Sequence, residues 1–179
     1  MTTDKIKLVL LPGLLNDARL WQPQIAALAA YADITVGDLT RHDTIAALAA
    51  DVLAQAPPGP FAMAGLSMGG YVALEIVRQA PERVLTLALL DTNARPDTTE
   101  ARAAREQLIA LADEHWHEVI ESLLPKLLHP KHLETGRWSR PSPQWPTVWA
   151  KKCSRASRTR SCIASTAARS CIGSVARHW

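Results

Sequence analysis

Ser67 lies at the centre of Gly65-Leu66-Ser67-Met68-Gly69, a G-x-S-x-G sequence. The apolar run Phe61–Leu66 precedes it, and the helix-like run Tyr71–Gln79 follows it. A serine hydroxyl becomes a useful nucleophile only when a base removes its proton. A strand, a sharp turn and a helix in this order expose such a hydroxyl at the edge of a sheet. The pattern therefore predicts acyl-transfer chemistry at Ser67.

Backbone N–H groups near the same turn are candidates for stabilising the negative charge of the transition state. The helix that starts at Met68 leaves its first N–H groups unpaired, so the Met68 N–H is one candidate. The loop after the first strand, Pro12-Gly13-Leu14-Leu15, is expected to supply the second, and Leu14 is the best candidate there. The alternative is structural, since many serines in glycine-rich turns merely cap the following helix.

The acid and base that such a serine needs are harder to assign. Asp91 ends a predicted strand at the same sheet edge as Ser67 and is a candidate acid. Its alternative role is to cap or hydrogen-bond the loop through Thr92 and Asn93. No base is assigned, because none of the later histidines follows a strand in a Gly-His context; they are His115, His117, His129, His132 and His178.

The first part of the chain alternates between strand-like and helix-like segments. Short apolar runs bounded by proline, glycine and aspartate predict strands at Ile6–Leu11, Ile34–Val36, Phe61–Leu66 and Val84–Leu90. Apolar residues at helical spacing predict helices at Ala18–Tyr31, Asp43–Ala56 and Gly69–Gln79, the second capped by Asp43 or Thr44. Short connections in this order predict an α/β fold, a parallel sheet with flanking helices.

The pattern changes after residue 96. Glu100–Leu111 and His115–Leu128 are amphipathic and have no strand between them, which predicts a helical cap or lid. We therefore expect a core at residues 1–96, a helical cap or lid segment at 97–136, and a basic tail at 137–179 that is not a domain. Because the strands stop early, the last strand should leave an apolar edge without a neighbour.

The tail differs sharply from the rest in composition. Residues 137–179 hold nine Lys and Arg and no acid, whereas residues 1–136 hold eleven bases and all 17 acids. Twenty-three leucines precede residue 134 and none follows it. Codons for Trp, Cys and most Ser begin with T, and a shift of one base moves that T to the middle position, which encodes apolar residues. We hypothesise that one base was lost near Arg137 and that the tail is disordered or poorly packed.

Two other interpretations of the tail are weaker. Its arginines among serines resemble a nucleic-acid-binding arm, but no aromatic stacking platform accompanies them. Cys153, Cys162 and Cys171 are nine residues apart, whereas zinc sites use closely paired cysteines and four ligands. We therefore expect no metal, no cofactor and no nucleic-acid partner.

Residues 5–135 resemble the α/β-hydrolase family. The resemblance lies in Leu10-Leu11-Pro12-Gly13-Leu14-Leu15, the elbow Gly65-Leu66-Ser67-Met68-Gly69-Gly70, and Leu87-Ala88-Leu89-Leu90-Asp91-Thr92. It implies a Ser–His–Asp mechanism on an ester, lactone, thioester or similar acyl bond, and a cap domain between late strands. Pro12-Gly13 stands where many members have His-Gly. The family carries its acid and histidine after later strands that this chain lacks, so we expect impaired activity.

The remaining features set the class of protein. No apolar stretch is long enough to span a membrane, and the N-terminus lacks the order of a secretory signal, so a cytoplasmic protein without membrane contact is expected. The expected partner is a small acyl substrate, and the sequence leaves the oligomeric state open. The alternative function is a non-catalytic ligand-binding protein on a hydrolase scaffold.

Overall fold

The computed structural model describes residues 5–14, 16–42, 44–95, 98–101, 103–104 and 129–131, and singly 107, 115, 118, 122 and 125. The chain divides into two compact units, with a division after Pro96. Leu15, Asp43, most of the predicted lid and the whole basic tail lie outside the described residues.

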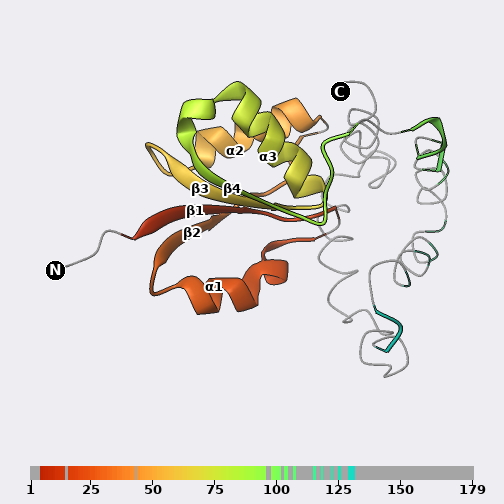
Figure 1. Ribbon diagram of the computed structural model, residues 1–179, viewed down its shortest axis with the longest axis horizontal. Helices are drawn as coiled ribbons and strands as arrows, with labels where there is room; N and C mark the ends of the chain where they lie inside the picture. Colours follow the sequence, from red (N-terminus) through yellow and green to blue (C-terminus); the bar gives the residue numbers. More distant parts are fainter. Residues whose placement is uncertain are drawn as a thin grey trace, which may run out of the picture. The chain divides into compact units, whose positions relative to one another are not determined.

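Four parallel strands form the sheet of the first unit, in the order β2-β1-β3-β4. The elements in chain order are β1 (Ile6–Leu11), η1 (Ala18–Trp21), α1 (Gln22–Leu28), β2 (Ala32–Val36), α2 (Ile45–Gln55), β3 (Phe61–Leu66), α3 (Met68–Gln79), η2 (Pro81–Arg83) and β4 (Val84–Leu90). Figure 1 shows α2 and α3 on one face of the sheet and α1 on the other. The predicted α/β fold with a parallel sheet and flanking helices is confirmed.

The predicted helix Ala18–Tyr31 is wrong as a single element. The chain forms a 3-10 turn first, in which the Asp17 side chain accepts a hydrogen bond from the Arg19 N–H. A short α-helix follows with proline in its first turn, a position where the missing proline N–H costs no intrahelical bond. In α2 the cap is Thr44, whose hydroxyl accepts from the Ala47 N–H at 3.1 Å.

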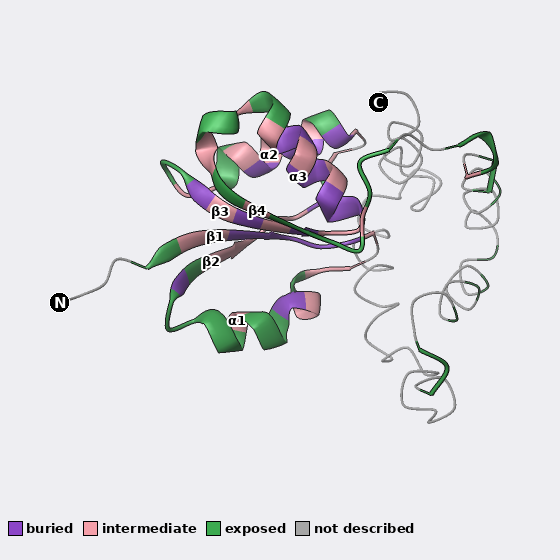
Figure 2. Ribbon diagram, viewed as in Figure 1, coloured by how far each residue is buried: buried purple, intermediate pink, exposed green. Residues whose placement is uncertain are grey.

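The core lies between the sheet and the helices α2 and α3. Its fully buried side chains include Val9, Leu11, Phe61, Met63 and Ile76. Figure 2 shows this burial on β1, β3 and the inner side of α3, whereas β4 is largely exposed. In the described sheet β4 is an edge strand, and Leu85 (65%), Leu89 (44%) and Leu90 (39%) are exposed, as expected of an apolar edge.

The described residues of the second unit are mostly helical. Helical residues at 99–101, 103–104 and 107 overlap the predicted helix Glu100–Leu111, and those at 118, 122 and 125 fall within the predicted helix His115–Leu128. Thr98 precedes the first of these helical residues, and its hydroxyl accepts a hydrogen bond from the Ala101 N–H at 3.2 Å. No helix in the described part of the chain is long and apolar enough to cross a membrane.

Candidate active site

Ser67 occupies the turn between β3 and α3, as the sequence predicts. Its backbone has φ 50° and ψ −114°, in the left-handed half of conformational space that non-glycine residues avoid. Such a conformation costs about 1–3 kcal/mol and persists only where the surroundings enforce it. The serine therefore sits on a strained bend.

Close backbone contacts explain the glycines on either side of this bend. A Cβ atom on Gly65 would overlap the Gly69 carbonyl, and a Cβ atom on Gly69 would overlap the Leu11 carbonyl. Any side chain at these positions would push β3, α3 and the end of β1 apart. The G-x-S-x-G spacing thus follows from the packing of the turn against two strands.

The Ser67 hydroxyl is not used to cap the helix. Ser67 is the residue before the first turn of α3, but its side chain makes no capping hydrogen bond. Thr44 does make such a bond at the start of α2, so a capping hydroxyl is possible in this fold. The helix-cap alternative for Ser67 is therefore wrong: the hydroxyl of this half-buried serine makes no hydrogen bond to the start of α3.

The loop after β1 lies against Ser67. A Cβ atom built on Gly13 would lie 3.5 Å from the Ser67 Cβ and 3.5 Å from the Leu66 carbonyl oxygen. Asn16 closes this loop: its N–H donates to the Gly13 carbonyl at 3.1 Å, and its side-chain amide donates to the Leu14 carbonyl at 3.0 Å. Sequence reasoning missed Asn16, although asparagine after a Pro-Gly turn is typical of such loops.

Met68 is the first residue of α3 and is buried, with 8% of its surface exposed. The first backbone N–H groups of an α-helix have no acceptor within the helix, and the Met68 N–H is one of them. The Gly70 N–H in the same turn donates to the Ser67 carbonyl at 2.9 Å. The predicted donors Leu14 and Met68 thus come from the two segments that border Ser67.

Two residues at the end of β4 bind the backbone of Ser67. The Ser67 N–H donates to the Leu90 carbonyl, and the Thr92 hydroxyl donates to the Ser67 carbonyl, each at 2.9 Å. Sequence reasoning did not assign Thr92 to the site, because a threonine after a strand carries no signal that its hydroxyl bonds a serine 25 residues earlier.

Asp91 lies at the sheet edge where it was expected. Leu66 and Leu90 are register partners in neighbouring parallel strands, so the residues that follow them, Ser67 and Asp91, are at the same edge. Asp91 is exposed and has φ 44°. The Thr92 hydroxyl is directed to Ser67 rather than to Asp91.

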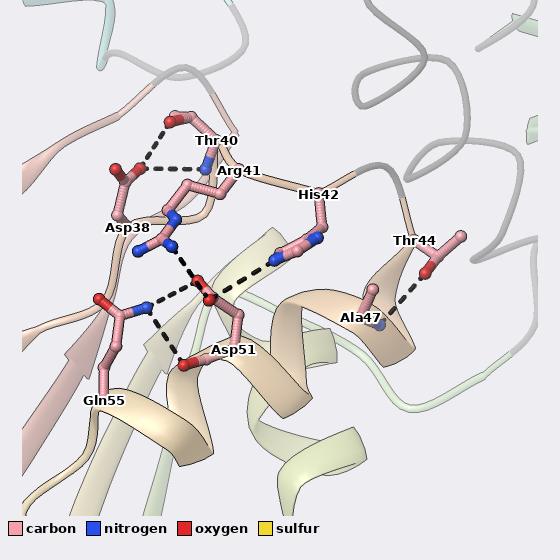
Figure 3. Close-up of polar contacts among 8 residues, drawn as sticks. All are labelled: Asp38, Thr40, Arg41, His42, Thr44, Ala47, Asp51 and Gln55. Carbon is pink, nitrogen blue, oxygen red and sulfur yellow. Dashed lines mark hydrogen bonds and ion pairs between the residues drawn. The ribbon is translucent and has the colours of Figure 1, made fainter.

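The described histidines fall in separate places. His42 follows β2, two strands away from β3, and its Nε2 lies 3.5 Å from the Asp51 carboxylate, which Arg41 and Gln55 also contact (Figure 3). His115 and His129 belong to the second unit, where the His115 Nδ1 lies 3.1 Å from Glu118. His117, His132 and His178 lie outside the described residues.

A parallel sheet covered on both faces, with a serine on the tight bend between strand and helix, defines the α/β-hydrolase fold. Three solved structures share it: a hydrolase from Pseudomonas aeruginosa PA01 (TM-score 0.68, 22% identity), the enol-lactonase from Burkholderia xenovorans LB400 (0.63, 21%) and a thermophilic esterase from Thermogutta terrifontis (0.58, 21%). The matches cover 98%, 97% and 96% of this chain, but only 66%, 64% and 64% of those proteins.

The thioesterase domain family matches residues 18–137, about two thirds of the sequence. The chain belongs to this family, and its fold is that of the α/β-hydrolases. The match ends at residue 137, three residues after Glu134, the last acidic residue of the sequence. No curated protein sequence matches the chain significantly.

Proposed function

We propose that this chain is the core of a serine hydrolase that cleaves a carboxylic ester, lactone or thioester through an acyl-serine intermediate. The observation that carries the proposal is Ser67 on its strained bend, with φ 50° and a hydroxyl that caps no helix. The thioesterase domain match and the esterase and enol-lactonase neighbours support an acyl substrate.

The proposed chemistry has two steps. The Ser67 Oγ loses its proton to a base and forms a bond to the acyl carbon, and the alcohol or thiol leaves with a proton. Water then attacks the acyl-serine, releases the acid and restores the hydroxyl. In each step the Leu14 and Met68 N–H groups stabilise the tetrahedral oxyanion, and loss of one such donor costs about 3 kcal/mol.

The proximity of the loop after β1 supports the first of these donors. Gly13 lies directly beside Ser67, and the Asn16 side chain bonds the next residue, Leu14, through its carbonyl. Together these contacts hold the loop against the nucleophile. Leu14 is therefore a donor candidate on the basis of its position as well as its place in the sequence.

The acid and the base of this mechanism are proposed on other grounds than the nucleophile. Asp91 is the candidate acid because it shares the sheet edge with Ser67.

We propose that residues 1–96 are the core and 97–136 the lid. We also propose that a one-base loss near Arg137 replaced the segment that would carry the histidine. The end of the family match at residue 137 supports this. A hydrolase without its base keeps only a small residual rate, about 10³–10⁴ over water.

A fluorophosphonate probe tests the proposal, because it reacts with activated serines. We expect slow covalent labelling at Ser67, located by peptide mass spectrometry, that disappears in Ser67→Ala. Ser122→Ala, at an exposed serine in the second unit, is the matched control and should label like the unaltered chain. Absence of Ser67 labelling, with binding of an acyl ligand intact, would refute the hydrolase and favour a ligand-binding protein.

A further inference from the structure

The strained bend at Ser67 is held from outside by the neighbouring strand. The Ser67 N–H donates to the Leu90 carbonyl, and the Thr92 hydroxyl donates to the Ser67 carbonyl, each at 2.9 Å. Both polar groups of the Ser67 backbone therefore have partners at the end of β4. Since the backbone conformation of Ser67 is unfavourable by itself, such external contacts are what maintain it.

The backbone of Asp91 brings these partners into place. Among the described non-glycine residues, Ser67 and Asp91 are the two with positive φ, at 50° and 44°. Asp91 stands between Leu90 and Thr92, so its turn allows the carbonyl before it and the hydroxyl after it to reach the same serine. This is a backbone role that does not require the Asp91 carboxylate.

Packing against α3 supports the same arrangement independently. A Cβ atom on Gly70 would lie 2.5 Å from the Thr92 Cγ2 and 2.6 Å from its Oγ1. The Thr92 side chain thus fits against the first turn of α3 only because residue 70 is glycine. The Gly70 N–H also donates to the Ser67 carbonyl at 2.9 Å, so that oxygen accepts two hydrogen bonds.

The Ser67 carbonyl and the Met68 N–H belong to the same planar peptide unit. A contact that fixes the direction of the carbonyl therefore fixes the direction of the N–H as well. Hydrogen bonds accepted at the carbonyl also polarise the peptide and strengthen its N–H as a donor. Met68 is one of the two donors in the proposed oxyanion site.

We infer that Thr92 is a positioning residue, whose hydroxyl orients the peptide between Ser67 and Met68 and so aligns the nucleophile with an oxyanion donor. This role rests on the proposed hydrolase function. Thr92 itself touches neither the substrate nor the reacting atoms in this scheme.

Two variants separate the hydroxyl from the rest of the side chain. Thr92→Val keeps the shape and removes the donor, whereas Thr92→Ser keeps the donor and removes the methyl group. With the fluorophosphonate probe we expect Thr92→Val to lower the limiting labelling rate about fivefold to tenfold, as for loss of one aligned hydrogen bond. The half-saturating probe concentration should change little, and Thr92→Ser should stay within about twofold of the unaltered chain.

Amide hydrogen exchange in the intact chain provides a readout that does not depend on activity. Thr92→Val should speed exchange in peptides that cover residues 65–70 and leave α2 unchanged, while Thr92→Ser should resemble the unaltered chain. If Ser67 is not labelled in any variant, the hydrolase proposal fails, and the exchange data then test only whether the Thr92 hydroxyl holds the peptide between Ser67 and Met68 in place.

Four results would overturn the inference. Thr92→Val could leave exchange at residues 65–70 unchanged, or raise it equally in α2, which would indicate general destabilisation. Thr92→Ser could have as large an effect as Thr92→Val, which would make the methyl group responsible. Finally, a labelled protein whose rate is the same with valine at position 92 would break the link between the hydroxyl and the reactivity of Ser67.

Discussion

Replacing Ser67 by glycine should stabilise the protein relative to replacing it by alanine. Both variants lack the hydroxyl, so the comparison isolates the backbone. With φ 50° and ψ −114°, Ser67 has a conformation that glycine adopts without a steric penalty and alanine does not.

The magnitude follows from two opposing effects. The strain of a non-glycine residue in such a region is about 1–3 kcal/mol. Glycine loses more freedom on folding than alanine, which offsets about 0.5–1 kcal/mol of the relief. The free energy of unfolding of Ser67→Gly should therefore exceed that of Ser67→Ala by about 1 kcal/mol at the middle of both ranges, and by no more than about 2.5 kcal/mol.

Urea unfolding followed by circular dichroism measures this difference. The matched control is Ala50→Gly at an exposed position inside α2, where glycine should lower the free energy of unfolding by about 1 kcal/mol. Opposite signs at the two positions are expected. If glycine at position 67 is no more stable than alanine there, the bend is not strained and the structural basis for an exposed nucleophile is lost.

Four further predictions concern the turn, a helix cap, the sheet edge and the gene. Gly69→Ala should lower the free energy of unfolding by at least about 2 kcal/mol in urea and abolish Ser67 labelling, because its Cβ would overlap the Leu11 carbonyl; near-native stability would contradict the tight turn. Thr44→Ala should cost about 1 kcal/mol in the same assay, while an unchanged midpoint would argue against its role as the cap of α2. Leu85 is 65% exposed on the edge strand, so Leu85→Lys should reduce concentration-dependent self-association in light scattering and change the free energy of unfolding by less than about 0.5 kcal/mol. Unchanged association would mean that this edge strand does not mediate contacts between chains. In the gene, the alternative frame after codon 137 should encode a strand, an Asp and then a Gly-His, whereas an unbroken frame shared with close relatives would reject the one-base loss.

Local sequence was sufficient for the strands with clear boundaries. Ile6–Leu11, Phe61–Leu66 and Val84–Leu90 are apolar runs bounded by proline, glycine or aspartate, and each predicted range matches the observed strand. The second strand was predicted from its β-branched part, Ile34–Val36, and begins two residues earlier. There Ala32 and Asp33 pair with β1, a contact that no pattern within the segment encodes.

The helix before β2 was predicted less well for a similar reason. Apolar spacing from Ala18 onward indicates a helix, but spacing alone does not distinguish one helix from a 3-10 turn followed by a shorter helix. The Asp17 contact with the Arg19 N–H and the proline in the first turn of α1 decide that division. Both signals are local, but the prediction relied on the helical spacing of the apolar residues instead.

By itself, the sequence determined the alternation of strands and helices and the place of Ser67 between β3 and α3, because both depend on short-range patterns of apolar residues and glycines. Only the tertiary structure decided that β3 lies between β1 and β4, that Gly13 borders the serine, and that Thr92 bonds its carbonyl. These contacts join residues far apart in the chain, and they form because adjacent parallel strands end at the same edge of the sheet.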